Sequence, residues 1–90
     1  MKYKIPHVIH LPFGYNVTVH QLGNKAFRMQ YNTVFGDSDS DGAAAFFIPK
    51  ENASTIILNK NRTWIDRRDD LIHELSHVMV EYGEYIKTLK

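Results

Sequence analysis

Two histidines and a glutamate form the run His73-Glu74-Leu75-Ser76-His77 near the end of the chain. On a helix, residues four apart lie about 40° apart around the axis and about 6 Å apart along it. The imidazoles of His73 and His77 can therefore point into one volume and share a cation. Zinc suits neutral imidazole ligands, and Glu74, about 100° round from His73, is placed to deprotonate a metal-bound water. We predict a zinc site with these two ligands and with Glu74 as the general base.

The segment around this motif has the pattern of an amphipathic helix. Acidic residues precede it, where the positive end of a helix dipole favours negative charge. Apolar residues then recur at steps of four, three and four, and they predict a wide buried stripe. We expect the helix to run from Asp66 to Tyr82, with Gly83 as a stop or a kink. The alternative interpretation is a solvated helix face that carries two histidines without a metal.

A third metal ligand is not fixed by the motif. Glu84 lies at nearly the same angle as the two histidines, but on an unbroken helix it would stand about 10 Å from His77 along the axis. It could reach the metal only if the helix breaks at Gly83 and the chain folds back. Glu84 is our first candidate, and Glu81 has the same difficulty in milder form. Three histidines of the N-terminal part, a partner chain or water remain open as alternatives; those histidines are His7, His10 and His20.

Upstream of the helix the pattern favours strands. Residues 13–20 alternate between apolar and polar, and so do residues 27–33, with a Gly-Asn turn signal between them. We expect an antiparallel hairpin there, two shorter strands near 43–48 and 55–58, and an irregular edge strand in the first twelve residues, which contain two prolines. Strands first and helix last predict an α+β fold. It would be a single domain, residues 1–90, with a mostly antiparallel sheet and one C-terminal helix packed on it.

The composition excludes several classes of protein. Ninety residues with 43% hydrophobic content allow one small core, to which a bound metal could add stability. The net charge is +1 and the basic residues are scattered, so we expect no nucleic-acid partner. The chain has no cysteine, which excludes disulfides and thiolate zinc sites. No signal peptide and no transmembrane run is visible, so we expect a cytoplasmic protein without a membrane partner.

A second candidate cation site lies in the acidic segment from Asp37 to Asp41. Its D-x-D-x-D-G spacing is that of the opening of an EF-hand calcium loop. The twelfth position is Ile48, where a bidentate glutamate is needed, and the flanks indicate strands rather than helices. We therefore favour a polar turn over a calcium-dependent adaptor.

Three segments together resemble the zincin metallopeptidases, and within them the small ImmA/IrrE-like proteins of bacteria and phages. The first segment is residues 54–61, which contain Leu-Asn at the end of an expected strand. The second is the Arg67-Arg68 pair, and the third is residues 71–79, which contain the H-E-L-x-H motif. Residues 45–49 are similar to the preceding strand of that family. The resemblance covers residues 42–82. It implies zinc-dependent hydrolysis of peptide bonds, with His73 and His77 as ligands, Glu74 as general base, and a protein or peptide as substrate.

The chain departs from that family in two respects. Helices usually precede the sheet there, and a later helix supplies the third ligand. The longer metzincin motif is absent because Val80 and Gly83 stand where glycine and histidine are expected. We therefore keep a second hypothesis, a non-catalytic zincin-like module that binds zinc in a phage or regulatory interaction protein. The resemblance implies a bacterial cytoplasm, or that of a host cell if the chain is phage-encoded.

Overall fold

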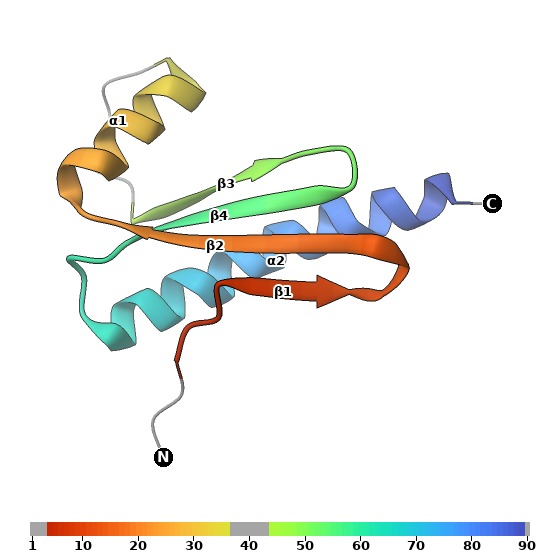
Figure 1. The fold of residues 1–90 in the computed structure, drawn as a ribbon, viewed down its shortest axis with the longest axis horizontal. Helices are drawn as coiled ribbons and strands as arrows, with labels where there is room; N and C mark the ends of the chain where they lie inside the picture. Colours follow the sequence, from red (N-terminus) through yellow and green to blue (C-terminus); the bar gives the residue numbers. More distant parts are fainter. Residues whose placement is uncertain (1–3, 37–43, 90) are drawn as a thin grey trace.

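The computed structural model describes residues 4–36 and 44–89 (Figure 1). Strand β1 (Val8–Leu11) leads through a short 3-10 turn, η1 (Pro12–Gly14), into β2 (Tyr15–Leu22). Helix α1 (Asn24–Phe35) follows, then strands β3 (Ala45–Pro49) and β4 (Ala53–Asn59), and last the long helix α2 (Trp64–Thr88). The acidic segment 37–41 lies outside the described residues.

The four strands form one sheet in the order β1-β2-β4-β3. The pairs β1–β2 and β3–β4 are antiparallel, whereas β2 and β4 are parallel, with Val19 opposite Ile56. The predicted α+β fold is confirmed: a small sheet, mostly antiparallel by pairing, carries the C-terminal helix on one face. The strands expected near 43–48 and 55–58 and the N-terminal edge strand are present, with bounds shifted by a few residues.

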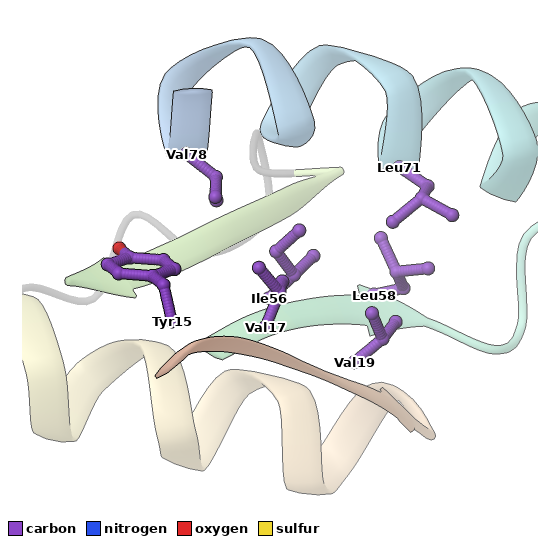
Figure 2. Close-up of a cluster of buried hydrophobic side chains, with 7 residues drawn as sticks. All are labelled: Tyr15, Val17, Val19, Ile56, Leu58, Leu71 and Val78. Atoms are coloured by element: carbon purple, nitrogen blue, oxygen red, sulfur yellow. The ribbon is translucent and has the colours of Figure 1, made fainter. Parts of the chain in front are cut away.

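The main core lies between the sheet and α2. Alternate side chains of β2 and β4 point toward α2, where they meet Leu71 and Val78, as Figure 2 shows. Tyr15, at the start of β2, is fully buried and its hydroxyl hydrogen-bonds that of Ser54 on β4. Burying each of these apolar side chains stabilises the fold by about 1.5–3 kcal/mol. Leu71 and Val78 also fix which face of α2 meets the sheet, and hence where the histidines lie.

The predicted hairpin of residues 13–20 and 27–33 is wrong in its second half, because residues 24–35 form helix α1. Phe27, Tyr31 and Phe35 follow one another at intervals of four, so the same residues that suggested alternation also form one face of a helix. Phe27 packs with Phe46 and Ile57 on the face of the sheet opposite α2. Met29, expected to alternate with them in a strand, is 62% exposed. Gly23 is the N-cap of this helix rather than part of a two-residue turn.

The predicted end of the last helix at Gly83 is also wrong. Helix α2 continues through Gly83 to Thr88, and Gly83 does not adopt the positive φ of a helix stop. Tertiary contacts hold the extension. Tyr82 donates a hydrogen bond to the carbonyl of Pro12 at 3.0 Å, and Tyr85 donates one to that of Phe13 at 2.6 Å. Both rings also pack against Tyr15.

Within residues 4–36 and 44–89, neither helix combines the length and the apolar character needed to cross a bilayer.

Candidate metal centre

Helix α2 starts close to the end of β4 and carries the motif in its middle. Its first turn is capped by Thr63, whose hydroxyl oxygen accepts a hydrogen bond from the backbone N–H of Asp66 at 3.1 Å. Arg62, in the connecting loop, donates to the Asp70 carboxylate at 2.6 Å and ties the loop to the helix. The motif therefore lies on a helix fixed at its start by a cap and an ion pair, and along its length by the core.

The two imidazoles converge as the spacing predicts. The Nε2 atoms of His73 and His77 are 3.3 Å apart, and both side chains are exposed. Two nitrogen ligands at 2.0–2.1 Å from a tetrahedral zinc ion are separated by about 3.3 Å. The distance between these nitrogen atoms is compatible with a shared zinc ion, and it is also that of a hydrogen bond between the two rings.

His77 is oriented by a strand residue. Its ring stacks on Phe47 of β3, with the ring centroids 5.5 Å apart and the planes at 4°. Phe47 is half-buried against the main core, so it offers His77 a fixed apolar plane. This contact restricts the rotamer of one proposed ligand before any metal binds, which lowers the entropy lost on binding.

Glu74 lies between the pair and the core. Its side chain is only 6% exposed, and burial raises the pKa of its carboxyl group. The nearby His77 and His73 oppose this shift and the Asp70 carboxylate adds to it, but burial dominates. A carboxyl group whose pKa moves toward neutrality is suited to accept a proton and later to release it.

A cavity of about 470 Å³ opens beside Glu74 and His77. Its other walls are mainly aromatic, and they come from the C-terminal half of α1 and from the edge strand β3. Besides the Tyr31 phenol, the carboxylate and one imidazole are thus the polar side-chain groups of a mainly apolar recess. The remaining lining residues are Tyr31, Phe35, Ala45, Phe46, Phe47 and Pro49.

We expect the metal-free Glu74→Gln variant to be more stable than the wild type at neutral pH. The pKa of Glu74 is higher in the folded state than in the unfolded state. The wild type therefore loses stability as pH rises from the unfolded-state pKa, about 4.3, through the folded-state value, because the buried carboxyl group must then be charged. The difference in free energy of unfolding should thus grow from near zero at acid pH in favour of glutamine. Urea titrations from acid to neutral pH measure it, with the exposed Glu84→Gln as control. A glutamine variant that is less stable at neutral pH would contradict the assigned burial.

The structure does not bring a third candidate ligand to the pair. Glu84 is exposed, and its carboxylate accepts a hydrogen bond from Lys87 at 3.2 Å. Since α2 is continuous, Glu84 stands seven residues, about 10 Å, beyond His77. Glu81 is subject to the same continuity and stands about 6 Å beyond His77. In the described part of the chain, no group of three or more His, Cys, Asp and Glu side chains is arranged to hold a metal ion.

The three N-terminal histidines lie elsewhere. His7 and His20 contact each other edge to face, and His7 also hydrogen-bonds the carbonyl of Val19. His10 hydrogen-bonds the side chain of Asn16. Strands β2 and β4 separate β1 from β3, which carries Phe47 beside His77. These histidines therefore lie toward the opposite side of the sheet from His77.

Sequence reasoning missed the aromatic wall of the site. The alternating pattern of residues 27–33 predicts a strand, whereas Tyr31 and Phe35 lie on helix α1 and line the cavity beside His77. Phe47 was placed in a strand, but nothing in the sequence pairs it with His77. The intervals of four between Phe27, Tyr31 and Phe35 were the available signal for a helix.

Comparison of the chain with models of protein families, with curated proteins and with solved structures finds no match.

Proposed function

We propose that this chain is a small zinc-dependent metallopeptidase that hydrolyses peptide bonds, with His73 and His77 as metal ligands and Glu74 as general base. The observation that carries the proposal is the 3.3 Å separation of the two Nε2 atoms, which matches a shared tetrahedral zinc ion. The buried Glu74 carboxyl group beside them supplies the second requirement of hydrolysis, a proton acceptor.

Zinc bound to the two imidazoles would lower the pKa of a water molecule and polarise the carbonyl group of the scissile bond. Glu74 accepts the proton of the attacking water while the water oxygen bonds to the carbonyl carbon. The same carboxyl group then passes that proton to the amine nitrogen as the carbon–nitrogen bond breaks. His77 stacks on Phe47, and this contact would fix the position of a bound metal relative to Glu74.

A protein or peptide substrate fits the surroundings of the site. Strand β3 is at one edge of the sheet, so its outer backbone groups can pair with an extended peptide. The cavity beside Glu74 and His77 offers an apolar recess for a substrate side chain. We propose a polypeptide substrate handled in the cytoplasm, with no nucleic acid or membrane involved.

The second candidate function is a non-catalytic zinc-binding module of an interaction protein. It is favoured by the missing third ligand among the described residues, because a catalytic zinc ordinarily has three protein ligands. The two functions differ in what Glu74 is for, since a module that only binds zinc does not need a proton acceptor beside the metal.

A library of peptides incubated with the zinc-loaded protein tests the proposed function. We expect cleavage that a chelator stops and that added zinc restores, with a large apolar residue close to the cleaved bond because the recess is aromatic. The chelated protein and the Glu74→Gln variant, prepared in parallel, control for contaminating proteases. Zinc binding without any cleavage would favour the non-catalytic module.

A further inference from the structure

Helix α2 carries a second apolar stripe that the core does not use. Ile65, Ile72, Met79 and Ile86 follow one another at intervals of seven residues and are 58%, 59%, 51% and 37% exposed. Seven residues make nearly two turns, so the four side chains lie in a line about 32 Å long. The line runs about 100° round the helix from the buried Leu71 and Val78. A sustained seven-residue apolar repeat is the pattern by which one helix packs along another.

Two of the three positions between these residues are small. Ser76 lies between Ile72 and Met79, and Gly83 lies between Met79 and Ile86, whereas Asp69, between Ile65 and Ile72, is exposed and paired with Arg68. The space around Gly83 is open, since a Cβ there would meet no atom within 4 Å. Residues this small let the backbone of a second helix approach closely, so the larger side chains on either side can interlock.

The stripe is symmetric about its centre, which points to a second copy of the same chain as its occupant. When two copies of α2 run antiparallel, Ile65 of one lies beside Ile86 of the other, Ile72 lies beside Met79, and the two Ser76 residues meet near the two-fold axis. A two-fold interface requires such self-complementarity, because the same surface meets itself.

Charge selects the antiparallel orientation. Asp66 and Lys87 each follow directly after an end member of the stripe, so they flank it on the same side. In an antiparallel pair, Asp66 of each copy lies beside Lys87 of the other, which gives two ion pairs across the interface. A parallel pair would instead place this flank on opposite sides of the interface in the two copies, and it would form neither ion pair.

We propose that the exposed stripe of α2 is the interface of an antiparallel homodimer of this chain. The inference is independent of the proposed activity. His77 lies about 160° round the helix from Met79 and stacks on Phe47, away from the stripe, whereas His73 directly follows Ile72 and lies on the same flank as Asp66 and Lys87.

Sedimentation equilibrium over a range of concentrations tests the association. The wild type is expected to form dimers, and Met79→Glu, which places a charge inside the interface, is expected to raise the dimer dissociation constant at least about tenfold. Met29→Glu is the matched control, because Met29 is an exposed methionine on the other helix, 62% exposed. It should dissociate as the wild type does. A wild type that remains monomeric throughout, or equal effects of the two variants, would overturn the proposal.

Cysteine substitutions test the orientation without background, because the chain contains no cysteine. Under mild oxidation, Ser76→Cys should form a disulfide between copies and Ile65→Cys should not. An equal mixture of Ile65→Cys and Ile86→Cys should cross-link. Disulfide formation by Ile65→Cys alone would show a parallel pair, and failure of Ser76→Cys together with the mixture would place the dimer interface elsewhere.

Discussion

Replacement of Glu74 by glutamine is expected to lower the turnover of a peptide substrate by about 100-fold or more, the usual cost of losing a general base. Glutamine has nearly the same shape but cannot accept the proton of the attacking water. Zinc content and fold should remain, because Glu74 is not one of the two proposed ligands. Turnover and bound zinc are measured on the same preparation, with Glu84→Gln on the exposed part of the helix as the control.

Two outcomes would change this account. If Glu74→Gln kept full turnover, another group would be the base, or the activity would belong to a contaminant. If Glu74→Gln bound zinc poorly, Glu74 would be a ligand or would support one, and the hypothesis of a non-catalytic zinc-binding module would be favoured. Loss of activity in Glu84→Gln would show that the helix opens at Gly83 when metal binds.

Replacement of His77 by alanine is expected to weaken zinc binding by more than about 100-fold, since losing even a supporting partner of a ligand typically costs 10- to 100-fold. The substitution removes one of the two converging nitrogen atoms and the ring that stacks on Phe47. The thermal stabilisation that zinc gives the wild type should disappear with it.

Competition with a zinc indicator measures this affinity, and Glu84→Ala is the matched control. That variant should bind zinc as the wild type does, because the Glu84 carboxylate is exposed and paired with Lys87. Zinc binding by His77→Ala at wild-type strength would mean that the two imidazoles do not form the site.

The sequence predicts the helix that carries the two histidines well because its signals are local. The interval of four between His73 and His77 sets their relative direction on any helix, and the apolar residues Leu71 and Val78 set which side is buried. The structure agrees in both respects: the two Nε2 atoms meet, and those side chains fill the core. Strands β3 and β4 were likewise visible as short apolar runs.

Features that depend on tertiary contacts could not be read in the same way. Phe27, Met29 and Tyr31 fit an alternating strand, whereas Phe27, Tyr31 and Phe35 at intervals of four fit a helix. In the structure these residues form the helix, and Phe27 packs against Phe46 and Ile57. Gly83 is a common stop signal, yet the hydrogen bonds of Tyr82 and Tyr85 to the turn before β2 keep the helix intact. Both errors arose where local propensity and tertiary packing disagree.

The same distinction applies to the site. Glu84 could reach the metal only through a helix break, and the continuous helix instead keeps it about 10 Å from His77 along the axis. The contact of Phe47 and the aromatic wall with the site could not be predicted. It depends on the order of the strands in the sheet and on the position of α1, which no local sequence pattern encodes.

Zinc titration of chelator-treated protein, with elemental analysis of the complex, tests the central claim most directly. We predict about one zinc ion per chain, a melting temperature that rises with zinc, and an affinity that falls as the pH is lowered, because protons compete with the metal for the imidazole nitrogen atoms. Protein that holds no transition metal and whose melting temperature is unchanged by zinc would contradict the account.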